Sequence, residues 1–456
     1  MRARRGRARF AGVAGVALAA LAVALAPAAG SGAAKPRKVA QATCFWEGPI
    51  SMKRPTTRGF DGHYFNFPEE SATYWMARFH LPSGASLELR GRYPHARYIS
   101  LNAYSDGAPT DALSDVVIHP RRGSTNPFVA GHRRDLPKRS WRVRVIDQAP
   151  PAAGSPRARN TIYAQSSSGG AIELFYRVYE PDRGLDLTGA TGLPRALLRL
   201  ADGTLVRQRD ACGQINDPDR SIPVQTTPQV QWEAGRNAPG CDGQTNPAYD
   251  PNRWERFFTY DFAALAVVTD CTQPGRTVRQ SQTPEVKGGS YSNKDSAYIY
   301  SHLSRRFGPL LVVRGKLPWT PRTYDGEPHM QKAQMRFWSL CAGESRVTTY
   351  TQDCLADRQL PLSAGRHYTI VVSKPADRPA NANRKCGVAW LEWPARGDGA
   401  GDPDYGLLIM RNMLVSPGFE NAIQRVEQPG TEAEVMGPYF PRAQYSSVED
   451  FEARGC

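Results

Sequence analysis

The sequence of 456 residues lacks the short motifs by which many enzymes and metal proteins are recognised. None of its eight cysteines forms a C-x-x-C pair, which argues against a zinc ribbon or a thioredoxin-type redox site. No H-x-x-x-H pair is present for zinc. Ser168-Gly-Gly170 lacks the preceding glycine of a G-x-S-x-G nucleophile elbow. The sequence therefore assigns no catalytic residue.

Long apolar runs are also lacking, except near the N-terminus. Basic residues from Arg2 to Arg9 precede an apolar run, Ala11 to Ala26, and small residues follow as far as Ala34. This order is typical of a cleaved signal peptide, here residues 1–34. The run is shorter than the roughly 20 residues that span a bilayer. We expect a secreted protein, extracellular or cell-wall associated, with no transmembrane segment after signal removal.

The cysteines all follow this segment, and an even number in an exported chain favours disulfides. Cys341 and Cys354 flank a segment that is expected to form a hairpin, so we predict that they are bonded to each other. Because the last residue is Cys456, the C-terminal tail is expected to be tied to the body of the protein.

Helical periodicity is scarce, and short runs of β-branched and aromatic residues end at Gly, Pro, Asp or Asn, which favours an all-β fold. From Trp141 to Val145 the residues alternate, which predicts a strand with Arg142 and Arg144 in solvent and its valines in a core. Four blocks recur in the same order in the second half: Leu87–Pro94 with Leu311–Pro318, Arg97–Leu101 with Arg336–Leu340, Trp141–Val145 with Tyr368–Val372, and Ile172–Arg177 with the strand ending at Arg411.

This repetition predicts two tandem β-sandwich (jelly-roll-like) domains, disulfide-bonded and with a few short helices. The first domain is expected over residues 44–209 and the second over residues 251–456. Residues 210–250 between them carry proline and glycine turn signals typical of a linker.

Several marks carry a resemblance to known families. They are Arg97-Tyr-Ile-Ser-Leu101, Asn126-Pro-Phe128, Asn160-Thr-Ile-Tyr163 and Tyr176-Arg-Val-Tyr-Glu-Pro-Asp182. Through them, residues 87–200 resemble a family of uncharacterised exported actinobacterial proteins. The second half resembles a bacterial β-sandwich domain of unknown function, through Phe337-Trp-Ser339 and Trp390-Leu-Glu-Trp-Pro394. The resemblance implies a fold and no established activity.

The formal net charge of +15 suggests anionic partners at the cell exterior, such as envelope polymers or glycans. The export signal and the scattered arginines argue against nucleic acid. A solvated, arginine-rich surface is the alternative explanation. Arginines recur at matching positions of both halves, at Arg90/Arg314, Arg97/Arg336 and Arg177/Arg411. They could form structural ion pairs or a shared anion site. The structural role is favoured, because both halves would need it.

Two further sets of residues are candidates for binding. Asp106, Asp111 and Asp115 offer carboxylates to calcium, the one cofactor that the sequence suggests, although Asp-Gly is also ordinary turn chemistry. Trp319, in a proline-flanked segment, is suited to stacking on a sugar ring, whereas Trp338 is expected in a core.

The sequence therefore predicts a secreted cell-envelope protein that acts by binding or scaffolding, with an anionic or glycan envelope component as its partner. The alternative is a secreted hydrolase acting on an envelope glycan or ester. Such an enzyme needs an acid pair or a nucleophile in a concave site. The sequence selects none of its many acidic residues for that role.

Overall fold

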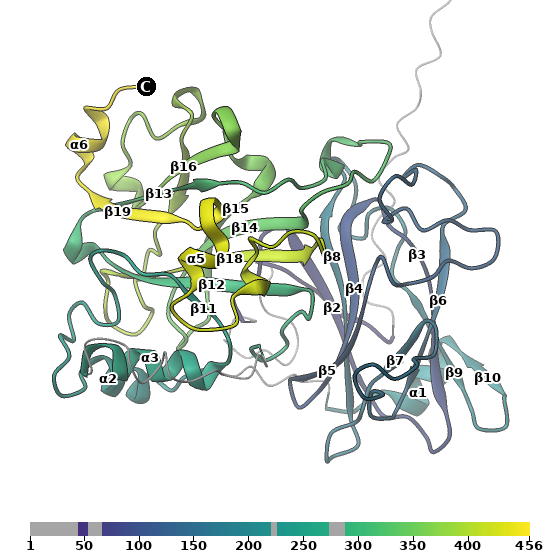
Figure 1. Ribbon diagram of the computed structural model, residues 1–456. Coiled ribbons are helices and arrows are strands. Elements are labelled where there is room, and N and C mark those ends of the chain that lie inside the picture. Colours follow the sequence, from purple (N-terminus) through teal and green to yellow (C-terminus); the bar gives the residue numbers. More distant parts are fainter. Residues whose placement is uncertain (1–43, 53–65, 220–225, 273–287) are drawn as a thin grey trace, which may run out of the picture. The chain divides into compact units, whose positions relative to one another are not determined.

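The computed structural model describes residues 44–52, 66–219, 226–272 and 288–456. Four sheets pair into two sandwiches with a few short helices, so the predicted fold class is confirmed (Figure 1). The predicted signal peptide, residues 1–34, lies outside the described residues. Within the described residues, no helix has both the length and the apolar composition needed to cross a bilayer.

The first sandwich contains one sheet of strand order β1-β2-β8-β4-β5 and one of order β10-β9-β3-β6-β7 (Figure 1). Its strands are β1 (Glu47–Ile50), β2 (Ala72–Phe79), β3 (Ser86–Arg92), β4 (Ala96–Ser105), β5 (Ala108–Ser114), β6 (Ser140–Ile146), β7 (Thr161–Tyr163), β8 (Ile172–Pro181), β9 (Arg195–Arg199) and β10 (Leu205–Arg207). Neighbouring strands are antiparallel except β6 and β7, which are parallel.

The second sandwich contains sheets of order β11-β12-β18-β14-β15 and β17-β16-β13-β19. Its strands are β11 (Glu255–Arg256), β12 (Ser296–Ser304), β13 (Leu310–Lys316), β14 (Met335–Gly343), β15 (Thr351–Ala356), β16 (His367–Ser373), β17 (Ala389–Glu392), β18 (Tyr405–Val415) and β19 (Arg442–Ser446). The α-helices are α1 (Gln208–Ile215), α2 (Gln229–Arg236), α3 (Tyr260–Thr272), α5 (Glu432–Met436) and α6 (Val448–Glu452). The predicted linker, residues 210–250, thus contains helical segments, and the predicted domain boundaries remain predictions.

The two halves repeat one strand arrangement. β8 and β18 are the central strands of their sheets, and β16 pairs in parallel with β17 as β6 does with β7. The register agrees too, because Ser100 of β4 lies opposite Arg177 of β8, and Ser339 of β14 lies opposite Arg411 of β18. The four repeated sequence blocks fall on strands that correspond in this way.

Burial distinguishes the outer strands from the central ones. In β6, Arg142 and Arg144 are exposed while Val143 and Val145 are buried, as the alternation predicts. In contrast, β4, β8 and β14 are buried along nearly their whole length. One face of β4 packs into its own sandwich through residues such as Leu101, and the other face carries Tyr98 into a cluster that includes Phe337 of the second half. These strands therefore have no solvent-facing side.

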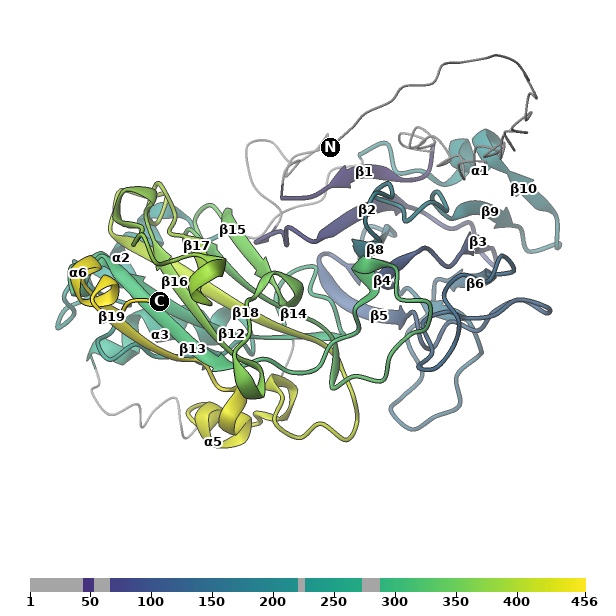
Figure 2. The ribbon, with the colours of Figure 1, turned by 90° about the horizontal axis from the view of Figure 1, so that it is seen from above.

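Four disulfides link the eight cysteines: Cys44–Cys212, Cys241–Cys271, Cys341–Cys354 and Cys386–Cys456. The Cys341–Cys354 bond joins directly opposite residues of β14 and β15. The last bond ties the C-terminal residue to a segment 70 residues earlier. Multiple disulfides indicate an oxidising compartment. In Figure 2, α6 and the C-terminus lie on the side of β19 and β16.

Candidate anion-binding pocket

Two buried ion pairs cross between the halves in a reciprocal way. Arg97 Nη1 lies 2.6 Å from Asp357 Oδ1, and Arg336 Nη1 lies 2.9 Å from Asp115 Oδ2. The arginines occupy corresponding places in β4 and β14, and the aspartates directly follow β5 and β15. Each half therefore supplies the arginine of one pair and the aspartate of the other, as in an isologous dimer interface. Arg97 and Arg336, predicted binding residues, have structural partners here.

The segments before β2 and β12 are exchanged in the same reciprocal way. Phe67 donates its backbone N–H to Thr349 O of the second half, and Tyr291 donates its own to Gly107 O of the first. Both residues have a φ of 53°, the left-handed region that few side chains adopt. Each half thus places an aromatic residue against a hairpin of the other. The matching backbone strain indicates that the packing between the halves holds both segments in place.

The central strands carry equivalent arginines whose partners differ in charge. Arg411 of β18 donates to Glu69 Oε2, a fully buried carboxylate. Arg177 of β8 donates from Nη1 to Asn102 Oδ1 at 2.7 Å and from Nη2 to Tyr291 O at 2.7 Å. Both of those acceptors are neutral. Arg177 thus has hydrogen-bond acceptors for its guanidinium group. It has no carboxylate at the position where Glu69 pairs with Arg411.

The surroundings of Arg177 are aromatic. The side chain is 2% exposed, and its guanidinium carbon lies 5.6 Å from the ring centres of Tyr74 and Tyr104 and 5.1 Å from that of Phe175. Among the described residues, no carboxylate comes within 4.0 Å of it. The Arg177 charge does lower the pKa of Asp295 against the larger effect of burial, so that carboxyl group compensates the charge in part. A buried guanidinium in such surroundings attracts anions.

Arg177 and Arg411 both line one pocket, which has an empty volume of about 970 Å³ including its open mouth. The lining comes from β2, β8, β12, β18, α3, the segments before β2 and β12, and the connections β11–α3 and β14–β15: Asn66, Phe67, Tyr74, Arg177, Tyr179, Phe257, Tyr260, Ala263, Gly289, Ser290, Tyr291, Ser292, Asn293, Tyr298, Tyr300, His302, Arg346, Leu407, Ile409 and Arg411. No aspartate or glutamate is among these described residues, so the lining offers no acid pair.

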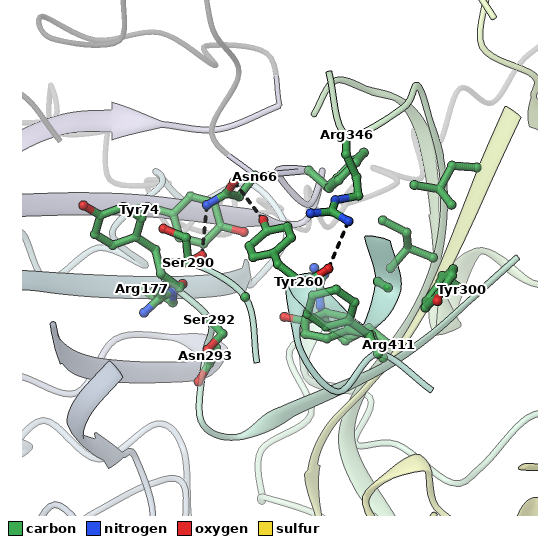
Figure 3. A pocket seen from close by; sticks show the side chains of 18 of the residues that line it. Asn66, Tyr74, Arg177, Tyr260, Ser290, Ser292, Asn293, Tyr300, Arg346 and Arg411 are labelled. Atoms are coloured by element: carbon green, nitrogen blue, oxygen red, sulfur yellow. Dashed lines mark hydrogen bonds between the residues drawn. The ribbon is translucent and has the colours of Figure 1, made fainter. Parts of the chain in front are cut away.

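The polar groups of the pocket are unevenly distributed. Figure 3 shows Arg177 with Ser290, Ser292 and Asn293 on one side. Tyr260 stands in the middle. The half-buried Arg346, the third cation of the lining, lies on the side of Tyr260 away from Arg177.

Arg346 is already engaged by Tyr260. It donates to the carbonyl of Tyr260 at 3.1 Å, and its guanidinium carbon lies 4.7 Å from the ring centre (Figure 3). Burial lowers the pKa of Arg346, but a guanidinium still remains protonated. The pocket therefore combines positive charge with a largely aromatic wall.

The predicted calcium residues are not brought together. Asp106 is in the β4–β5 turn with a positive φ of 48°. Asp111 Oδ2 accepts hydrogen bonds from Arg157 at 2.5 Å and from the backbone N–H of Tyr163 at 2.9 Å, and Asp115 pairs with an arginine. Among the described residues, the one close group of potential ligand atoms contains Glu69 and two disulfide-bonded cysteines instead. Calcium binding by the three aspartates stays a prediction.

The two tryptophans behave differently. Trp319 is 60% exposed, and the guanidinium carbon of Arg366 lies 4.2 Å from its ring centre. Trp338 is buried in the second core, with its ring centre 5.5 Å from that of Tyr368. Sugar stacking on Trp319 stays a prediction, and the exposure of its side chain permits it.

The repeated arginines of the sequence pointed to the pocket, but their pattern could not separate a binding role from a structural one. Arg177 and Arg411 stood out as a repeated pair, but the repetition favoured a structural role for both. The distinction depends on their neighbours: the place of Asn102 on β4 corresponds to that of Cys341 on β14. Glu69 reaches Arg411 from a segment 342 residues away in the chain. No local pattern indicates that contact.

The comparisons with known proteins assign no family. No protein-family model matches the chain, and no curated protein matches it. An uncharacterised protein of Burkholderia cenocepacia with a solved structure is distantly similar, at 12% identity and a TM-score of 0.42, over 86% of this chain and 84% of its own. A protein of Vibrio parahaemolyticus has 11% identity and a TM-score of 0.36, over 83% of this chain and 90% of its own.

Proposed function

We propose that this protein is an exported binding protein of the cell envelope, and that it holds a small organic anion in the pocket beside Arg177. The four disulfides fit an extracellular or cell-wall location. The choice of an anion is consistent with the net charge of the chain. Attachment to a larger envelope polymer would occur through an acidic group of that polymer.

The observation that carries this proposal is the unequal pairing of two equivalent arginines. The repeat places Arg177 and Arg411 at matching positions, yet only Arg411 has a buried carboxylate, Glu69. Leaving a buried charge without a counterion is costly, whereas an incoming anion would gain a strong charge-assisted hydrogen bond. A bound ligand would thus supply the charge that the first half lacks.

A purely structural role for Arg177 is the competing explanation, because its Nη2 holds the carbonyl of Tyr291. The two roles can be separated by changing the charge next to Arg177 while keeping the hydrogen bonds. Asn102→Asp does this. Its Oδ1 already lies 2.7 Å from Arg177, and the Asn102 Nδ2 atom that becomes an oxygen has no hydrogen-bond partner among the described residues.

The test measures anion binding to the mature, disulfide-bonded protein by isothermal titration calorimetry and thermal shift. Benzoate, octanoate, octyl phosphate and galacturonate are the probes. At least one of them is expected to bind the wild type. Asn102→Asp is expected to weaken that binding at least about tenfold, because a charge-assisted hydrogen bond contributes about 1.5–3 kcal/mol. The fold should remain intact by circular dichroism.

Asn237→Asp is the matched control, since it adds the same charge at an exposed residue outside the pocket lining. It should bind the probe as the wild type does. Equal affinity in Asn102→Asp and the wild type would overturn the proposal, and so would the failure of all four probes to bind the wild type.

A further inference from the structure

Small polar side chains gather on the Arg177 side of the pocket, whereas Leu407, Ile409 and Ala263 give its other side an apolar wall beside Arg346. We infer that its ligand is an amphiphilic organic acid, with the acid group at Arg177 and an apolar acyl or aryl body extending along β18 beneath α3. This inference rests on the proposed function and specifies the ligand class. A sugar acid is the alternative that it rejects.

The sheet face supplies the apolar path. Leu407, Ile409 and Arg411 alternate along β18, so their side chains point to the same face and line the pocket together. At about 3.3 Å per residue, the path from Arg411 to Leu407 is roughly 13 Å long. Ala263 of α3 packs with Leu407 in one apolar cluster, so the helix covers this end of the path.

Two tyrosine hydroxyls of the lining, those of Tyr260 and Tyr300, already donate to other residues. Tyr260 donates its hydroxyl to Asn66 Oδ1 at 3.2 Å (Figure 3). Tyr300 donates its own to Glu255 Oε2 at 3.2 Å. Burial raises the pKa of Tyr260 to about 12, so the hydroxyl stays protonated at neutral pH. A pyranose acid would bring several hydroxyl groups against Leu407, Ile409 and Ala263, whose side chains offer no hydrogen-bond partner, and each unpaired hydroxyl would cost free energy.

The remaining cation on the apolar side does not change this conclusion. Arg346 already donates to the Tyr260 carbonyl and stacks on the same ring. Both arginines donate to neutral acceptors, but Arg177 lies on the side with Ser290, Ser292 and Asn293, whose polar side chains suit an acid group (Figure 3). The acid group is therefore assigned to Arg177.

A chain-length series tests the apolar path. Butyrate, hexanoate and octanoate carry the same acid group, so each added methylene that is buried should tighten binding roughly fourfold. Octanol, which has no charge, and galacturonate, which has no apolar body, should each bind at least about tenfold more weakly than octanoate. Phenylpropanoate distinguishes an aryl body from an acyl one, and binding of either supports the inference.

Ala263→Trp fills the covered end of the path. It should abolish most of the gain from butyrate to octanoate. Ala264→Trp is the matched control on the same helix, because Ala264 is outside the pocket lining, and it should keep the wild-type series. Thermal unfolding of both variants checks that α3 remains folded.

The outcomes separate the two proposals. If galacturonate binds as tightly as octanoate, or the series is flat in the wild type, the amphiphilic ligand is refuted. Asn102→Asp can still show that an anion binds at Arg177. If octanol binds as tightly as octanoate, and Asn102→Asp has no effect, the anion-binding function itself fails. An unchanged series in Ala263→Trp places the apolar body elsewhere and refutes the path along β18.

Discussion

Replacing Asp357 by alanine is expected to lower the free energy of unfolding by about 3–5 kcal/mol, the usual cost of removing one partner from a buried ion pair. Arg97 Nη1 lies 2.6 Å from Asp357 Oδ1 and 2.7 Å from Oδ2, and both side chains are almost completely buried. Asp357 Oδ2 also accepts the backbone N–H of Trp338 at 3.2 Å. The substitution thus leaves a guanidinium and an amide with one acceptor fewer inside the interface.

The effect should lie toward the lower end of that range, because Arg97 keeps a second carboxylate. Its Nη2 lies 2.6 Å from Glu180 Oε2, and Glu180 is shared with Arg358. Asp357→Asn should cost less than Asp357→Ala, since the amide oxygen can still accept from Arg97. A smaller loss for asparagine would indicate that hydrogen bonding, in addition to charge, stabilises the crossing.

Asp325→Ala is the matched control. Asp325 also pairs across the two halves, with Arg183 at 2.5 Å, but the two side chains are 61% and 70% exposed. Exposed pairs contribute less than about 1 kcal/mol because water and salt screen them. Urea unfolding, followed by tryptophan fluorescence and circular dichroism, gives both changes. Equal losses for Asp357→Ala and Asp325→Ala would refute the view that the buried crossed pairs hold the halves together.

Three further outcomes are expected. Burial raises the pKa of Asp115 from 3.8 to about 7, so its contribution to stability is full below about pH 4 and is lost as pH rises through about 7; Asp115→Asn should flatten this slope in urea unfolding between about pH 4 and pH 8. Trp319→Ala should leave the unfolding midpoint unchanged, because the side chain is 60% exposed, and any loss of glycan binding on an array would assign sugar stacking to it. Removing the Cys241–Cys271 bond, which closes a loop of 30 residues, by double substitution to serine should lower stability by about 3–4 kcal/mol, and octanoate affinity in calorimetry should fall if the bond steadies α3 over the pocket.

Features that depend on local geometry could be predicted from the residues alone. The alternation in Trp141–Val145 predicted which side of β6 is buried, because successive residues of a strand point to opposite faces. The repeated blocks predicted two similar sandwiches, since the same order of strands folds in the same way. The even number of cysteines predicted disulfides, and the hairpin predicted the Cys341–Cys354 bond that the structure contains.

Which strand faces are covered by the other half depends on long-range packing, and the sequence pattern did not predict it. On β4, Ser100 and Asn102 alternate with apolar residues and would be taken as solvent-facing, yet they are 0% and 1% exposed. Segments far away in the sequence cover this face of the strand. The alternation of residues within the strand does not indicate that its polar face is buried. Arg97 and Asp357 are separated by 260 residues, and Glu69 and Arg411 by 342. The role of a buried charge depends on which groups pack against it. Arg177 and Arg411 therefore differ in their counterions only because the packing brings different distant segments to each of them.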